Sequence, residues 1–126
     1  MKQKILLLGS SGFIGTYLKK QLQKDYDIYC YDLMLGKEYD INNFRMLRKI
    51  FMATTPNVVI NLAAYMGKNK EKNHKVNVVG MKKVLKLCRQ FKSKLIFTSS
   101  AAVYGNAIIF PTSEHQTTNP INHYGK

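Results

Sequence analysis

Three glycines stand where the backbone could bind the phosphates of a nucleotide. Gly9, Gly12 and Gly15 follow an apolar run at residues 5–8 and precede apolar residues at helical spacing. A chain that turns sharply from strand to helix needs glycine torsion angles, and a phosphate needs close access to amides that a Cβ would obstruct. The start of the helix adds free N–H groups and a favourable dipole. The spacing predicts a dinucleotide site, and the alternative is a glycine turn that binds nothing.

Asp32 lies where a carboxylate could select between dinucleotides. It ends a second apolar segment, residues 27–32, which follows the expected first helix. At that place a carboxylate can accept hydrogen bonds from the ribose hydroxyls of adenosine, and it would repel a 2′-phosphate. We therefore expect NAD rather than NADP. The alternative is a solvated aspartate at the end of a strand.

Strand and helix patterns alternate along the chain and would position these residues. Short apolar runs predict strands at residues 5–8, 27–32, 58–62 and 95–97, with apolar residues at helical spacing between them. Such an alternation predicts an α/β fold of the Rossmann type. We expect a doubly wound parallel sheet with strand order 3-2-1-4, helices on both faces, and one NAD-binding domain over residues 1–126. After residue 100 we expect an irregular segment.

Further motifs follow the glycine turn in a fixed order. They are Asp40-Ile41, Asn-Leu-Ala-Ala-Tyr at 61–65, Asn-Val-Val-Gly at 77–80, Phe-Thr-Ser-Ser-Ala-Ala-Val-Tyr-Gly at 97–105 and Pro-Ile-Asn-His-Tyr-Gly-Lys at 120–126. Together with the Gly-x-x-Gly-Phe-Ile-Gly turn, they resemble the extended short-chain dehydrogenases/reductases, the NAD-dependent epimerase/dehydratase family. The resemblance covers the whole chain.

The resemblance implies a set of residues that bind the cofactor NAD. Within it, Asp40 would meet the amino group of adenine, and residues 62–65 would line the cofactor. The implied residues are Gly9, Ser11, Gly12, Phe13, Ile14, Gly15, Asp32, Leu33, Asp40, Ile41, Leu62, Ala63, Ala64, Tyr65 and Asn77.

The resemblance also implies two catalytic residues, Ser100 and Tyr124. Tyr124 would act as general acid/base on a hydroxyl or carbonyl of a sugar nucleotide, and Ser100 would hydrogen-bond the same oxygen. Hydride would pass to or from the nicotinamide. Taken without the motifs around them, the two residues would be a loop tyrosine and a turn-forming serine. The parent protein would be an epimerase, dehydratase or reductase and a homodimer, and the alternative is a module that binds NAD without catalysis.

In the family, a lysine four residues after the tyrosine favours the phenolate from the same face of a helix. Here Lys126 follows Tyr124 by two residues, which would place it on roughly the opposite side of a helix. We therefore expect an N-terminal part of such an enzyme, truncated before the remaining strands and the substrate domain and inactive by itself. Its fourth strand would be an unpaired apolar edge.

The chain departs from the family pattern in its second loop, because Asp32 and Asp40 are close together in sequence. A short loop there resembles dTDP-4-dehydrorhamnose reductases, whereas the Ser-Ser-x-x-Val-Tyr-Gly motif points towards epimerases and dehydratases. Val76 stands where the family often has a polar residue near the cofactor. The sequence leaves the choice among these activities open.

The composition restricts the partners and the location. A net charge of +13 could attract nucleic acid, but the aromatic residues do not interleave with the lysines as stacking platforms require. We favour a solvated lysine-rich surface that attracts an anionic sugar nucleotide. The apolar runs are too short for a membrane span or a secretory signal, which predicts a cytoplasmic protein. Cys30 and Cys88 lie in apolar patterns without metal-ligand spacing, so we expect buried thiols and no metal site.

Overall fold

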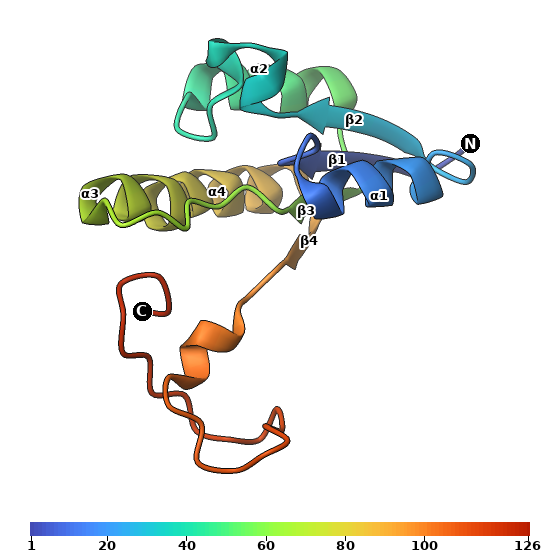
Figure 1. Cartoon of the computed structure of the whole chain (residues 1–126). Coiled ribbons are helices and arrows are strands. Elements are labelled where there is room, and N and C mark those ends of the chain that lie inside the picture. The colour runs from blue at the N-terminus through green and yellow to red at the C-terminus, as the bar shows by residue number, and fades with distance from the viewer.

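A parallel sheet of four strands forms the centre of the molecule (Figure 1). The structure, a computed structural model, describes residues 1–126. The strands are β1 (Lys4–Leu8), β2 (Asp27–Tyr31), β3 (Val58–Asn61) and β4 (Lys94–Phe97). Ile5 lies beside Ile28 on one side and Val58 on the other, and Val58 lies beside Lys94. The expected Rossmann-type parallel sheet is confirmed.

The strand order corrects the sequence prediction: it is β2-β1-β3-β4 and not 3-2-1-4. β1 is buried along most of its length and has a neighbour on each side, whereas β2 begins at the exposed Asp27 and is only partly buried. An edge position tolerates such polarity better than a central one. Between β2 and α2 the chain forms only the 3-10 turns η1 (Leu33–Leu35) and η2 (Lys37–Tyr39). No strand follows there to pair with the outer side of β2, which is therefore an edge strand.

Helices cover both faces of the sheet. α1 (Phe13–Leu22) packs on the face where Ile5, Leu7 and Ile60 are buried. α2 (Phe44–Thr54) and α4 (Met81–Phe91) pack on the opposite face. The core between these helices and the sheet consists of Leu6, Leu8, Tyr31, Ile41, Leu47, Phe51, Val59, Val84, Leu87 and Cys88.

The helix before β4 begins earlier than its apolar pattern indicated. It starts with α3 (Lys70–Asn73), continues through the π-helical turn η3 (His74–Gly80) and ends in α4. The side chain of Asn69 accepts a hydrogen bond from the Lys72 N–H at 2.9 Å and so caps the start of α3. The first turns are rich in lysine and lack apolar spacing, so apolar periodicity alone does not identify them as helix.

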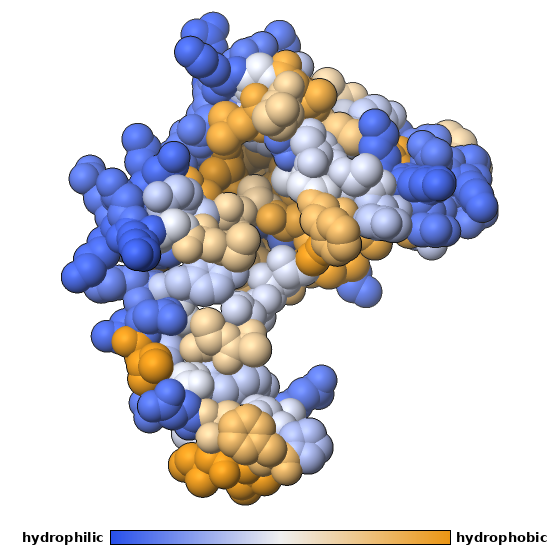
Figure 2. All heavy atoms as spheres, in the orientation of Figure 1, coloured by the Kyte–Doolittle hydropathy of each residue, from blue (hydrophilic) through white to orange (hydrophobic).

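β4 is the last strand of the sheet and pairs only with β3. Its Ile96 and Phe97 are 44% and 55% exposed, so the expected apolar edge is present. After it come the short turn η4 (Ala101–Tyr104) and an irregular segment that extends away from the sheet (Figure 1). Figure 2 shows an apolar surface at the far end of this segment, where residues 108–110 are exposed. No helix has the length and apolar character that crossing a bilayer requires.

The two cysteines differ in burial. Cys88 of α4 is buried, whereas Cys30 of β2 is only partly buried, which corrects the expectation of two buried thiols. The edge position of β2 accounts for the difference. Burial raises the pKa of the Cys88 thiol to about 11.

Candidate functional site

The candidate site lies at the edge of the sheet where all four parallel strands end. Chain connections diverge there, because β2 lies on one side of β1 and β3 on the other. In open α/β sheets, a crevice for ligands forms at this topological switch point. Gly9, which follows β1, therefore occupies the position that the fold offers to a nucleotide.

The three glycines of the turn meet different demands. Gly9 has φ +79°, and a Cβ built on it would lie 2.8 Å from the backbone nitrogen of Ala63. A Cβ on Gly15 would collide with the Gly9 carbonyl oxygen and lie 2.8 Å from Ser10 Cα. A Cβ on Gly12 would find only one atom, 3.5 Å away. Packing therefore requires Gly9 and Gly15, whereas Gly12 leaves open space in front of the turn.

Asp32 is brought to the glycine turn, as the sequence predicted. Its Oδ2 accepts a hydrogen bond from the Ser11 N–H at 2.9 Å, and its Oδ1 accepts one from the Met34 N–H at 2.9 Å. The side chain is partly exposed, and the neighbouring Leu33 is exposed. The carboxylate thus holds the turn from the side and remains accessible to a ligand.

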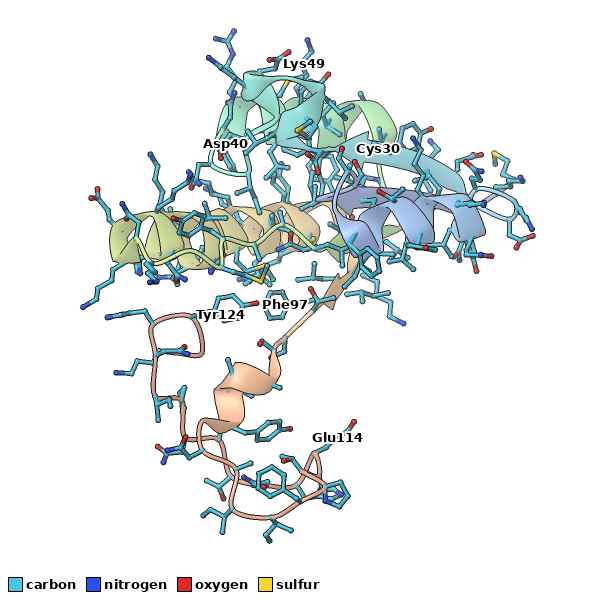
Figure 3. All side chains as sticks on the ribbon, viewed as in Figure 1. Cys30, Asp40, Lys49, Phe97, Glu114 and Tyr124 are labelled. Atoms are coloured by element: carbon cyan, nitrogen blue, oxygen red, sulfur yellow. The ribbon has the colours of Figure 1, made fainter.

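Asp40 and Ile41 differ in what they can offer. The Asp40 side chain accepts a hydrogen bond from the Asn42 N–H at 2.7 Å. The Asp40 carbonyl oxygen accepts one from the Tyr31 hydroxyl at 2.9 Å. Figure 3 shows Asp40 on the α2 side of the molecule. The Ile41 side chain is buried in the core and packs against Gly80. A ligand could therefore meet Ile41 only through its backbone.

Residues 62–65 run past the glycine turn and are held at both ends. The Leu62 N–H donates to the Leu8 carbonyl at 2.9 Å. At the other end, Asn77 accepts from the Tyr65 N–H at 2.8 Å and donates to the Tyr65 carbonyl at 2.9 Å. These two hydrogen bonds to the backbone of one residue give Asn77 a positioning role for the segment.

Ser100 and Tyr124 line one cavity of about 230 Å³, together with Ala63, Ala64 and Asn77. The Ser100 Oγ accepts a hydrogen bond from the Ala102 N–H at 3.2 Å. Figure 3 shows Tyr124, from the C-terminal segment, beside Phe97 at the end of β4, and both line the cavity. The predicted pair of residues is therefore brought together from two distant parts of the chain.

Lys126 lines the same cavity as Tyr124, although its spacing predicted a position on roughly the opposite side of a helix. Residues 122–126 form a turn and not an extended helix. The Gly125 N–H donates to Asn122 Oδ1 at 2.8 Å, and the Lys126 N–H donates to the Asn122 carbonyl at 3.2 Å. These two bonds are those of a capped first helical turn, with Asn122 at the N-cap position.

Sequence reasoning missed Asn61 and Asn73, which also line the cavity. Asn61 ends β3 and accepts a hydrogen bond from the Ala63 N–H at 3.1 Å. Both side chains are buried, 2% and 5% exposed respectively. A polar residue closing an apolar strand could have indicated Asn61, and the spacing of four residues from Asn77 could have indicated Asn73.

Comparison with known proteins agrees with this fold. Residues 3–126 match the RmlD substrate binding domain family. Protein CapI from Staphylococcus aureus is 33% identical over 95% of this chain and 43% of its own length. A UDP-glucose 4-epimerase from Lactobacillus helveticus is 31% identical over 98% of this chain and 43% of its own length.

Solved structures show the same arrangement. A dTDP-4-dehydrorhamnose reductase from Bacillus anthracis, in complex with NADP, has a TM-score of 0.86 and 28% identity over 99% of this chain and 46% of its own. A UDP-glucose 4-epimerase from Brucella ovis, in complex with NAD, has a TM-score of 0.86 and 31% identity over 98% of this chain and 43% of its own.

The fold and the sequence motifs thus define an extended short-chain dehydrogenase/reductase, a class of NAD-dependent epimerases, dehydratases and reductases. Within this class, the chain belongs to the RmlD substrate binding domain family. It spans less than half the length of the relatives described above.

Proposed function

We propose that this chain is the NAD-binding part of a sugar-nucleotide epimerase, dehydratase or reductase. One observation carries the proposal: the glycine turn at the switch point is bonded to Asp32, and residues 62–65 lead from it to the cavity of Ser100 and Tyr124. A dinucleotide lying along this path would have its phosphates at the turn and its nicotinamide in the cavity.

The residues fit NAD in three respects. The open space at Gly12 admits the pyrophosphate, and α1 begins there without a side chain capping its amides. These amides and the helix dipole favour an anion. The partly exposed Asp32 would accept hydrogen bonds from the ribose and repel a 2′-phosphate, which favours NAD over NADP. Asp40 and the backbone of Ile41 would lie on the adenine side.

Bound NAD would accept or return a hydride at the sugar. Tyr124 would exchange a proton with the reacting hydroxyl or carbonyl. Ser100 accepts a hydrogen bond from Ala102, which leaves its own O–H free to donate to the same oxygen. The relatives support a nucleotide-linked sugar as substrate, because several of them are epimerases and reductases of such sugars.

A polypeptide of only these 126 residues would bind NAD but turn over little substrate. It lacks a lysine at the family spacing after Tyr124, and general acid/base help of this kind is typically worth about 10²–10⁴-fold. An assay with NAD and a panel of sugar nucleotides would measure this. Turnover at the level of an intact family enzyme would contradict it and would point to Lys126, which lines the same cavity.

Titration with NADH and NADPH, followed by fluorescence, tests the cofactor site. We expect the chain to bind NADH more tightly than NADPH. Gly12→Ala should weaken NADH binding by about tenfold or more, because the new methyl group occupies the space in front of the amides. Asp32→Asn should reduce the difference in affinity between NADH and NADPH, since it removes the negative charge that would repel the 2′-phosphate of NADPH.

Asp27→Asn is the matched control for the aspartate, because Asp27 is exposed at the opposite end of β2. It should bind both cofactors like the original chain. Tighter binding of NADPH than of NADH would refute the role of Asp32. Absence of NADH binding by the unaltered chain would refute the proposed function itself.

A further inference from the structure

The cavity that contains Ser100 and Tyr124 is lined by three asparagines with different hydrogen bonds. Asn61 uses both ends of its side-chain amide within the protein, donating to Met81 Sδ and accepting from the backbone after β3. Asn77 also uses both ends, on the backbone N–H and carbonyl of Tyr65. Asn73 uses only one end.

Asn73 donates from its side-chain Nδ2 to the Tyr65 carbonyl at 3.2 Å, beside the stronger bond from Asn77 to the same oxygen. Its side-chain oxygen has no hydrogen-bond partner in the protein. The one fully enclosed side-chain polar atom without a partner is Gln116 Oε1, so the Asn73 oxygen retains some exposure, and Asn73 lines the cavity. Asn73 is only 5% exposed, and at the candidate site it has a side-chain acceptor that the protein does not use.

The local helix geometry places Asn73 and Asn77 together. The π-helical turn η3 begins directly after Asn73, and π turns occur frequently at functional sites. The Lys72 ammonium lies 4.8 Å from the centre of the Tyr65 ring. Tyr65 is therefore held by its backbone and by its ring, so a change at Asn73 leaves the segment in place and alters mainly the acceptor.

We propose that Asn73 is a ligand-binding residue whose side-chain oxygen accepts a hydrogen bond from an O–H or N–H group of the nicotinamide half of the dinucleotide. This inference rests on the proposed function, which places the nicotinamide and its ribose in this cavity. Both the ribose and the carboxamide of that half carry suitable donors. A ligand that covered this acceptor without offering a donor would leave it unpaired, which is unfavourable and selects a ligand with a donor at this place.

The test compares three ligands on one variant. Asn73→Ala should weaken NADH binding about three- to tenfold, the range expected for loss of one uncharged hydrogen bond. AMP, which lacks the nicotinamide half, should bind within about twofold of its original affinity. ADP-ribose locates the donor: weakened binding assigns it to the ribose, and unchanged binding assigns it to the carboxamide.

The matched control is Asn57→Ala. The Asn57 side chain accepts a hydrogen bond from the Lys4 N–H at 2.8 Å, at the opposite end of the strands, so the variant loses a similar bond outside the site. It should leave all three affinities unchanged. If Asn73→Ala does not fold, Asn73→Ser removes most of the side chain with a smaller change in polarity and serves in its place.

Two results separate the two proposals. If the unaltered chain binds NADH but the Asn73 variant binds it equally well, or loses NADH and AMP to the same extent, the role of Asn73 is wrong and the proposed function stands. If the unaltered chain binds neither ligand, both proposals are wrong.

Discussion

Replacement of Gly9 by alanine should destabilise the fold before any ligand is considered. The residue has φ +79°, a conformation that costs an L-residue about 1–2 kcal/mol. The new methyl group would lie 2.8 Å from the Ala63 nitrogen and 2.9 Å from the Leu62 carbonyl carbon. Both atoms are backbone at the end of a central strand, so relief requires movement of β3 or β1, at a further cost of about 1–3 kcal/mol.

We therefore expect the free energy of unfolding of Gly9→Ala to fall by about 2–5 kcal/mol. For a chain of this size the melting temperature should drop by roughly 8–20 °C. Chemical denaturation followed by circular dichroism measures the first quantity, and thermal denaturation measures the second. A loss of this size is a large part of the total stability of a small domain, about 5–15 kcal/mol.

Gly12→Ala is the control within the same turn. Gly12 has φ −72°, and its nearest atom to a new Cβ is 3.5 Å away, so the variant should lose no more than about 1 kcal/mol. Gly9→Ala should therefore lower mainly the stability, whereas Gly12→Ala should lower mainly the affinity for NADH. Equal stabilities for Gly9→Ala and Gly12→Ala would refute the argument, since it assigns the cost to contacts that only Gly9 makes.

Two further predictions concern groups whose pKa is raised. Burial raises the pKa of Cys88 to about 11, so iodoacetamide should alkylate Cys30 first in the native chain and both thiols equally in denaturant; equal native rates would contradict this. Burial raises the pKa of Tyr31 above its usual range, and the negative charge of Asp40 raises it further. The folded state then holds this proton more tightly than the unfolded state, so the stabilisation is present below about pH 10 and is lost as the pH rises further. Denaturation at stepped alkaline pH should show this loss, and Tyr31→Phe should reduce its slope; an unchanged slope would exclude Tyr31 as the cause.

The glycine turn and the strands could be predicted because each depends on residues close together in sequence. The apolar run of β1 and the change to helical spacing after Gly15 identify a strand, a turn and a helix without any distant contact. The end of β2 follows in the same way, and in a parallel sheet it must lie near the end of β1. The contact between Asp32 and Ser11 was therefore within reach of sequence reasoning.

The strand order could not be read from the same local patterns. The order depends on which strand β3 pairs with after α2. A pattern of apolar residues indicates that a strand is buried but does not identify the strand beside it. The short segment between Asp32 and Asp40 was the available signal, because it has room for two 3-10 turns and no additional strand. Partial polarity in β2 was a second signal, since it indicates an edge.

The position of Lys126 was beyond sequence reasoning for a similar cause. A spacing of two residues separates side chains on a helix, but it does not exclude that both residues border one cavity. Residues 122–126 form a single turn, in which the Asn122 side chain accepts from the Gly125 N–H in the manner of a helix N-cap. Asn73 was missed because its position is fixed by a hydrogen bond to Tyr65, which lies in a loop without regular periodicity.

The two halves of the candidate site are supported in different ways. Around the glycine turn, each element is bonded to another across the sheet: the Gly9 N–H donates to Tyr31 and the Leu62 N–H donates to Leu8, both at 2.9 Å. The segment that carries Tyr124 is held mainly by bonds within itself, such as the Asn119 N–H to the Val103 carbonyl at 2.9 Å. Binding of nucleotide phosphates, as proposed, would therefore use a surface that the core has already formed. Orientation of the reacting groups depends instead on how that segment meets the helix of Asn73 around the cavity.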